Sequence, residues 1–390
     1  MPRIAPFDGL LYSPAVDDLA SVTAPPYDVI LPHDLPRYHQ ASSRNIARVD
    51  LGEGGAGTDP DDKYTEAGEL LRRWQEDGTL VPTGGPAVYA YEMRFLYRAR
   101  ERSIRGVVVE VELREWGDGV IPHERTMPGP VEDRLAHLRA TAANISPIYA
   151  VVTGPCPPQT ELIERAASRA PDRELVDDEG VRHRLWVERD PDPALLEWYR
   201  DRSLLIADGH HRYQTALAHQ RAQRGANGPG PWDAVMMLVV DAAVEEPPVL
   251  PIHRVVDVDP LPTLGTERVR DLGEILAWLS DDDLRFGAAY RHDGGLHHVV
   301  GRLGGDPPTV AALHEHLLER LPGVREVAFV HDPALAEEMV HTGRRDLALF
   351  LPPARVEHVR ATVEAGRRLP EKSTYFWPKP RTGMVIRRAG

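Results

Sequence analysis

The sequence has almost no cysteine, since Cys156 is the single one among 390 residues. One thiol cannot form an intrachain disulfide, so a disulfide framework like that of small secreted domains is excluded. The same scarcity is typical of proteins that stay in a reducing compartment, and we expect a cytoplasmic location. Cys156 stands between Gly-Pro and Pro-Pro in a predicted loop, so we assign it no catalytic role.

Long apolar runs and an excess of positive charge are also lacking. No stretch approaches the ~20 apolar residues that a membrane-spanning helix needs, and Met1–Pro6 lacks the apolar stretch of a signal peptide. The 46 basic residues are outnumbered by 60 acidic ones, which gives a formal net charge of -14. This balance argues against nucleic acid or a membrane surface as the main partner, but it allows a local basic pocket. The oligomeric state stays open.

The length indicates two or three domains at roughly 150 residues each. Residues 257–266 are rich in Pro and Asp and mark a composition shift. We therefore predict a core with an N-terminal extension over residues 1–256. A smaller α/β domain follows over residues 257–390, with a tail that can return to the core.

Apolar patterns within these domains alternate between strand and helix periods. The predicted strands of the core include 87–97, 103–113, 148–152, 181–187, 204–207 and 233–241, and its predicted helices include 61–76, 133–143 and 211–221. The second domain has predicted helices at 267–280 and 308–321 and strands at 285–291, 297–303, 326–331 and 347–351.

The stretch Leu204–Ala216 concentrates chemistry at a strand-to-helix turn. Four apolar residues lead into Asp208-Gly209, and a predicted helix follows. A helix N-terminus offers unpaired N–H groups and a partial positive charge, which suit a phosphate. Gly209 lets a ligand approach the backbone. The candidate phosphate ligands are Gly209, His210, His211, Arg212 and Thr215, and Asp208 is a candidate for Mg²⁺ or a hydroxyl. A plain strand–helix connection fits this turn equally well when the turn is taken alone.

A second joint carries His123-Glu124-Arg125-Thr126, between predicted strands and a predicted helix. Phosphoryl transfer needs a base, a carboxylate for Mg²⁺ and cations on the transferred group, and the two joints together supply them. Divalent metal binding is the rival interpretation. Neither joint has two His spaced i, i+4, so we rank a protein-held Zn or Fe below Mg²⁺ carried by a nucleotide.

Further segments also hold candidate ligand contacts. Pro25 and Pro26 hold the backbone extended beside Tyr27 and Asp28. The aromatic and basic tail 369–386 contains Lys379 and Arg381. The remaining candidates are Asp133, Arg134, Asn144, Ser146, Lys372, Ser373 and Thr374. On local grounds an entry loop with a packed Tyr and an ordinary C-terminal strand explain the first two segments as well.

Several of these motifs occur together in one family. The chain resembles the uncharacterised prokaryotic family called domain of unknown function 1015, and the resemblance spans most of the chain from Pro6 to the tail. The segments that carry it are Pro25–Ile30, His123–Thr126, Asn144–Ile148, Ala207–Tyr213 and Lys372–Tyr375.

A more remote resemblance is to the superfamily of ParB, sulfiredoxin and the free serine kinases. Pro147–Val151 and Asp208–Arg212 match its Pro-Ile strand and its Gly-x-His-Arg turn. The resemblance implies an α/β (α+β) fold with a ParB/sulfiredoxin-like core, and a nucleotide site built from Gly209 to Arg212. It also implies that Glu124, by its order in the chain, corresponds to the glutamate that acts as base in the serine kinases.

The sequence departs from that superfamily in three ways. About 50 residues separate the Pro-Ile strand from the phosphate turn, which is longer than usual connections. His210 stands where sulfiredoxin has a Cys, so sulfinic acid reduction is not expected. No basic DNA-binding region is present, so a partition role is not expected either.

These inferences lead to a first hypothesis of a cytoplasmic kinase. It would use ATP or ADP with Mg²⁺ to phosphorylate a free small-molecule hydroxyl, with L-serine as the favoured acceptor. Glu124 would be the general base, and Asp208 would bind Mg²⁺ or the acceptor. Acceptor contacts or supporting residues would be Tyr27, Asp28, His123, Arg125, Thr126, Asp133, Arg134, Asn144, Ser146, Lys372, Ser373 and Thr374. The alternatives are a nucleotide-binding regulatory protein and a metal-dependent hydrolase.

Overall fold

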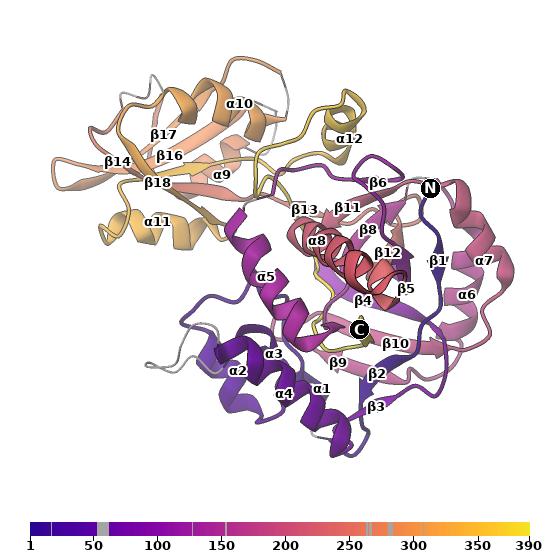
Figure 1. The fold of residues 1–390 in the computed structure, drawn as a ribbon. Coiled ribbons are helices and arrows are strands. Elements are labelled where there is room, and N and C mark those ends of the chain that lie inside the picture. The colour runs from indigo at the N-terminus through magenta and orange to yellow at the C-terminus, as the bar shows by residue number, and fades with distance from the viewer. Residues whose placement is uncertain are drawn as a thin grey trace. The chain divides into compact units, whose positions relative to one another are not determined.

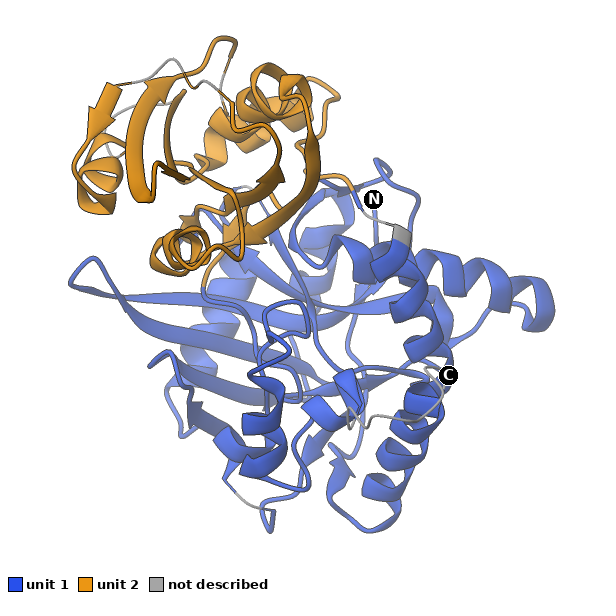
Figure 2. Cartoon of the chain, turned by 90° about the vertical axis from the view of Figure 1, so that its left-hand side faces the viewer, with its two compact units in different colours: residues 1–122, 126–247, 378–390 blue, residues 123–125, 248–377 orange. Residues whose placement is uncertain are grey.

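The structure is a computed structural model, and it describes residues 1–16, 18–52, 62–126, 128–152, 154–262, 264, 267–279, 284–306 and 308–390. The chain divides into two compact units (Figure 2). Unit 1 contains Met1–Pro122, Thr126–Pro247 and Pro378–Gly390, and unit 2 contains His123–Arg125 and Pro248–Trp377. The sequence-based division at 256/257 thus differs by nine residues from the junction at 247/248, and the last thirteen residues belong to unit 1.

A mixed sheet forms the centre of unit 1. In the described part of the chain its path is β6 (Val120–Ile121), β11 (Leu204–Asp208), β8 (Ile148–Val152), β12 (Ala234–Asp241), β5 (Arg100–Glu112), β4 (Val88–Tyr97), β10 (Arg182–Glu188) and β9 (Arg173–Val176), and β1 (Ile4–Ala5) pairs with β5. β12 is parallel to β8 and antiparallel to β5. Its residues 235–241 are all buried, as expected for a central strand covered on both faces.

Helices cover this sheet because alternate strand residues form an apolar face. Val107, Val109 and Val111 of β5 belong to a cluster with every second residue of the neighbouring strands. The helices α6 (Pro157–Ala167), α7 (Pro193–Trp198) and α8 (His210–Asn227) add apolar side chains to the same cluster. The short 3-10 helices η1 (Tyr199–Asp201) and η2 (Pro231–Asp233) lie before β11 and β12. Helix α5 (Pro128–Thr141) packs beside α8 (Figure 1).

A smaller sheet joins both ends of the chain within unit 1. Its strand order is β3 (Leu80–Pro82), β2 (Gly9–Tyr12), β21 (Ile386–Arg388) and β7 (Ala143–Asn144). Leu10 of β2 pairs with Ile386 of β21. The helices α1 (Leu19–Val22), α2 (Leu35–Ala41), α3 (Ala47–Leu51) and α4 (Asp62–Glu76) pack an apolar cluster against it.

Unit 2 has its own sheet with helices on both faces. The strand order is β15 (Glu267–Val269), β17 (Gly295–Arg302), β16 (Arg285–His292), β19 (Leu347–Phe350), β14 (His253–Val258) and β18 (Val324–Val330). Val256 and Val258 face a cluster with α10 (Thr309–His316) and the 3-10 helix η3 (Leu318–Arg320). The intervening Val255 faces α9 (Leu272–Leu279) and α11 (Pro333–His341). Helix α12 (Val356–Glu364) and the pair β13 (Val249–Leu250) and β20 (Tyr375–Phe376) complete the unit.

The predicted mixed α/β fold class is confirmed. One element was predicted wrongly: residues 267–269 form a strand, and the predicted helix 267–280 begins only at Leu272. Residues 263 and 265–266 of the predicted boundary, together with Asp61 and Ser280 at the ends of predicted helices, lie outside the described residues. In the described parts of the chain, every helix is too short or too polar to span a bilayer.

Candidate functional site

The turn between β11 and α8 begins with a glycine in the left-handed region. Gly209 is the N-cap of the eighteen-residue helix α8 and has φ 95°. A glycine N-cap has no side-chain oxygen to cover the first N–H groups of the helix. The left-handed backbone favours glycine here. A Cβ at position 209 would lie 3.0 Å from Nε of Arg212, so the guanidinium would also have to shift.

Asp208 lies at the centre of a charged network at this turn. Its Oδ2 is 2.6 Å from Nη2 of Arg212, and its Oδ1 is 2.5 Å from Nζ of Lys379. Nζ of Lys379 is also 3.6 Å from Oδ2 of Asp28. Burial lowers the pKa of Lys379, but the charges of Asp208 and Asp28 outweigh that effect and raise it. The cationic form of Lys379 is therefore stabilised.

This network does not fit the expectation that Asp208 binds Mg²⁺. Each oxygen of Asp208 already accepts a bond from a cationic side chain, and a metal ion would have to displace one of them. Within the described residues, no group of three or more His, Cys, Asp and Glu side chains is placed to hold a metal ion. The arrangement instead makes Asp208 an anchor for Arg212 and Lys379.

Arg212 also ties α8 to the segment that precedes β8. Its Nη1 donates to Oγ of Ser146 at 2.8 Å and to the carbonyl oxygen of Pro147 at 2.7 Å. The predicted Pro-Ile strand and the predicted phosphate turn are therefore joined directly, although a long insertion separates them in sequence. To bind a phosphate, Arg212 would have to give up some of its hydrogen bonds to these protein oxygens.

The two histidines of the turn face the protein interior. The side chains of His210 and His211 are buried, and the ring of His210 stacks on Trp116 with a centroid distance of 6.4 Å. Tyr213 packs against the same indole at 4.4 Å. The prediction that both imidazoles bind phosphate directly does not fit this burial.

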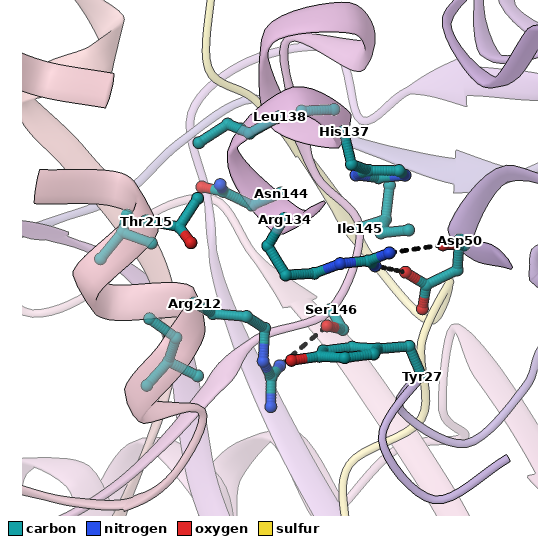
Figure 3. A pocket seen from close by; sticks show the side chains of 13 residues that line it. Tyr27, Asp50, Arg134, His137, Leu138, Asn144, Ile145, Ser146, Arg212 and Thr215 are labelled. Atoms are coloured by element: carbon teal, nitrogen blue, oxygen red, sulfur yellow. Dashed lines mark hydrogen bonds and ion pairs between the residues drawn. The ribbon is translucent and has the colours of Figure 1, made fainter. Parts of the chain in front are cut away.

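A small cavity in unit 1 brings several predicted site residues together. It has a volume of about 50 Å³ and lies between α3, α5, α8 and the segment 143–148 (Figure 3). Six of the residues that line it were predicted from sequence: Tyr27, Arg134, Asn144, Ser146, Arg212 and Thr215. Hydroxyl, amide and guanidinium groups therefore meet here from four segments of the chain.

Arg134 is held rigidly in the wall of this cavity. Its Nη1 is 2.7 Å from Oδ1 of Asp50, and its Nη2 is 2.6 Å from Oδ2 of Asp133. Its guanidinium lies over the ring of Tyr27, 4.2 Å from the centroid (Figure 3). Lys63 donates to Oδ1 of Asp133 from the other side at 2.8 Å. These contacts fix both the position and the charge of Arg134.

The remaining predicted residues, apart from Thr126, lie in unit 2, where two distant segments pair. Glu124 forms a parallel bridge with Leu369, and its Oε2 accepts from the backbone N–H of Ser373 at 3.1 Å. Nε2 of the fully buried His123 is 2.6 Å from Oγ1 of Thr374. Lys372 precedes these residues with a positive φ of 51°. The two predicted motifs thus contact one another, although about 250 residues separate them.

Arg125 continues the same pairing, because its N–H donates to the carbonyl oxygen of Leu369 at 3.1 Å, and Thr126 is assigned to unit 1. Arg125 lines an open, charged cavity of about 680 Å³ together with Arg368 and Glu371. The predicted site residues are therefore distributed over two units and at least two cavities.

Comparison with known protein families gives the same family that the motifs predict. The sequence pattern of one protein family matches residues 4–276, more than half of the chain. The chain belongs to the DUF1015 family, described as proteins of unknown function. The family predicted from the motifs is thus confirmed. No curated protein matches the sequence of this DUF1015 member.

Solved structures with a similar arrangement share little sequence with this DUF1015 protein. A free serine kinase variant in complex with AMP is 15% identical, with 69% of this chain and 86% of that chain covered and a TM-score of 0.38. A variant of the free serine kinase in complex with ADP is 16% identical, with the same coverage and TM-score. C-terminally truncated SbnI from Staphylococcus aureus is 12% identical, with 70% and 85% covered and a TM-score of 0.37.

Two residues of the cavity were not predicted for this DUF1015 protein. Asp50 and His137 both line it, and His137 donates through Nε2 to the carbonyl oxygen of Val49 at 2.9 Å. Helical spacing is the signal that could have found them. Asp50 follows Ile46 by four residues on an otherwise apolar helix face, and His137 follows Arg134 by three on α5.

The ionised form of Asp133 contributes to stability above its unfolded pKa. Burial opposes ionisation, but the charge of Arg134 and the bonds from Lys63 and Tyr64 outweigh it and hold the pKa of Asp133 well below the usual 3.8. A depressed folded pKa stabilises the protein above the unfolded value, and this contribution is lost as pH falls through the folded value. Urea unfolding should show Asp133→Asn less stable than wild type near neutral pH, with the difference shrinking below about pH 4. A difference that does not change with pH would contradict the assignment.

Proposed function

We propose that unit 1 binds a nucleotide at the first turn of α8 and that the protein is a nucleotide-dependent kinase. The acceptor is a free small-molecule hydroxyl, with L-serine favoured. The observation that carries the proposal is the glycine start of α8, which directly follows a carboxylate that holds two cations. A long helix with an uncapped glycine start is a suitable site for phosphate oxygens.

Binding of a phosphate would rearrange the ion pairs that Asp208 forms with Arg212 and Lys379. Arg212 and Lys379 neutralise Asp208 in the free protein. A nucleotide phosphate at the start of α8 offers the same two cations more oxygens and more charge than one carboxylate. We expect the phosphate to accept some of the hydrogen bonds that Arg212 and Lys379 donate to Asp208. Before a phosphate binds, Asp208 holds both cations in position. Any Mg²⁺ would arrive with the nucleotide rather than reside on Asp208.

The transfer step itself needs a base for the acceptor hydroxyl. The acceptor oxygen attacks the terminal phosphorus, its proton passes to the carboxylate of Glu124, and the bond from phosphorus to the bridging oxygen of the nucleotide breaks. The products are a phosphomonoester and a nucleotide one phosphate shorter. The N–H of Ser373 donates to Oε2 of Glu124 and orients the carboxylate. The role of Glu124 follows from the superfamily resemblance.

A regulatory protein that binds nucleotide without transfer is the second candidate. One observation favours it: Arg212 and Lys379 are satisfied by protein oxygens, so ligand binding would exchange one complete network for another. Such an exchange is what a two-state switch requires.

Phosphorus NMR separates the candidates. The protein is incubated with Mg²⁺, ATP or ADP, and a mixture of amino acids. A new phosphomonoester signal that requires one amino acid is the result expected for the kinase. Bound but unchanged nucleotide, or slow phosphate release alone, is the result expected for the regulatory protein. Stoichiometric metal in the purified protein, measured by elemental analysis, would instead favour a metal-dependent hydrolase.

Replacing Gly209 by alanine should weaken nucleotide binding about tenfold, because a Cβ would obstruct the close approach of a phosphate to the first N–H groups of α8. The new Cβ also meets the guanidinium of Arg212. Gly228→Ala is a matched control, because Gly228 caps the other end of α8 with φ 75° and open space around its Cβ position. Calorimetric titration with ADP and ATP should show normal affinity for Gly228→Ala. Equal affinity of both variants would refute the assigned nucleotide site.

A further inference from the structure

The carboxylate of Asp50 is incompletely satisfied inside the protein. The residue is 4% exposed, and its Oδ1 accepts from Nη1 of Arg134 at 2.7 Å. Its Oδ2 is fully buried and has no hydrogen-bond partner among the described residues. A buried charged oxygen without a donor costs free energy, so such an atom calls for an explanation.

The cavity beside Asp50 offers the space that a donor would occupy. Asp50 is one of its lining residues (Figure 3). Its volume of about 50 Å³ corresponds to several water molecules at roughly 10–15 Å³ each, or to the polar head of a small ligand. The hydroxyls of Ser146 and Thr215 contribute to the same wall.

The two guanidinium groups that line the cavity are already bonded to protein oxygens. Arg134 donates to Asp50 and Asp133, and Arg212 donates to Ser146, Pro147 and Asp208. A bound carboxylate would therefore meet committed guanidinium groups and would lie beside the charged Asp50, which disfavours it. An ammonium group would supply the donor that Oδ2 lacks and would add the opposite charge.

We propose that this cavity binds the ammonium group of the acceptor, with Asp50 as its counter-ion. The acceptor is then a compact hydroxyl compound with a primary amine, and its ammonium donates to Oδ2 of Asp50. Ser146 has a hydroxyl hydrogen to offer the same ligand, because its oxygen already accepts from Arg212. The inference rests on the proposed kinase function for the identity of the ligand as acceptor, but the ammonium subsite is tested separately.

Binding to the wild-type protein without nucleotide tests the subsite. Ligand-observed NMR at neutral pH compares ethanolamine with ethylene glycol and glycolate, which lack the ammonium. We expect ethanolamine to bind at least about tenfold more tightly than either, since one hydrogen bond between charged groups is worth roughly that factor. L-serine should compete with ethanolamine. Equal binding of all three compounds, or of none, would overturn the inference.

A variant pair provides the second measurement. Asp50→Asn keeps the size of the side chain and an oxygen for Arg134, and it should reduce ethanolamine binding about tenfold. Glu69→Gln, on the exposed face of α4 in the same unit, should leave it unchanged. If Asp50→Asn fails to fold, the comparison of the three compounds on the wild type decides.

Nucleotide titration on the same samples separates the two proposals. Nucleotide binding without ethanolamine binding overturns the ammonium subsite and leaves the kinase proposal standing. Ethanolamine binding without any nucleotide binding supports the subsite and overturns the kinase.

Discussion

Replacement of Glu124 by glutamine should lower the turnover of phosphoryl transfer by about 10²–10⁴-fold and leave nucleotide affinity unchanged. The amide cannot accept the proton of the acceptor hydroxyl, so the step loses its base. Glutamine keeps the size of the glutamate side chain and one of its oxygens, so the hydrogen bond from the N–H of Ser373 can still form. The effect should therefore appear in kcat rather than in binding.

Steady-state rates from the phosphomonoester signal, together with calorimetric titration of nucleotide, measure both quantities. Glu357→Gln is the control, because Glu357 is an exposed carboxylate on α12 of the same unit. The acidic limb of the pH–rate profile, which reports ionisation of the base, should be present in wild type and in Glu357→Gln. Full activity of Glu124→Gln would show that Glu124 is not the base.

The start of α8 was predictable because its signals are local. Four apolar residues, an Asp-Gly pair and a helical pattern identify the joint. The predicted helix at His211 begins one residue earlier, at His210. Glycine was expected to allow ligand approach, and the structure adds that Arg212 lies close against the space that a side chain would fill.

The partners of the charged residues could not be predicted from sequence. Lys379 was a candidate ligand contact, but its pairing with Asp208 depends on the return of residues 378–390 to unit 1. The pairing of Leu10 with Ile386 likewise joins opposite ends of the chain. Such contacts have no local pattern, since register is set by packing of the whole sheet.

For the cavity, sequence identified six of the lining residues but not their roles. Arg134 was expected either to contact the acceptor or to support another site residue, and in the structure its donors are directed to Asp50 and Asp133. The choice between binding a ligand and supporting another side chain depends on which carboxylates lie nearby. This is why the unsatisfied oxygen of Asp50 became visible only in three dimensions.

Lys379→Met should lower the free energy of unfolding by about 3 kcal/mol, which is the size expected when one partner of a buried ion pair is removed. The side chains of Lys379 and Asp208 are only 8% and 13% exposed, so water cannot replace the missing charge. Lys63→Met is the matched control, because Lys63 pairs with Asp133 but is 41% exposed. That variant should lose at most about 1 kcal/mol. Urea unfolding of both variants near neutral pH measures the difference.

The pH dependence of the same variants tests whether charge, rather than packing, causes the loss. Because Asp208 and Asp28 raise the folded pKa of Lys379 above the usual 10.5, its contribution is complete below that value and is lost as pH rises through the folded pKa. The difference between wild type and Lys379→Met should therefore shrink at alkaline pH. The double variant Asp208→Asn with Lys379→Met should be more stable than the sum of the single losses predicts, since both charges leave together. A loss that is additive and independent of pH would mean that Lys379 stabilises unit 1 by packing alone.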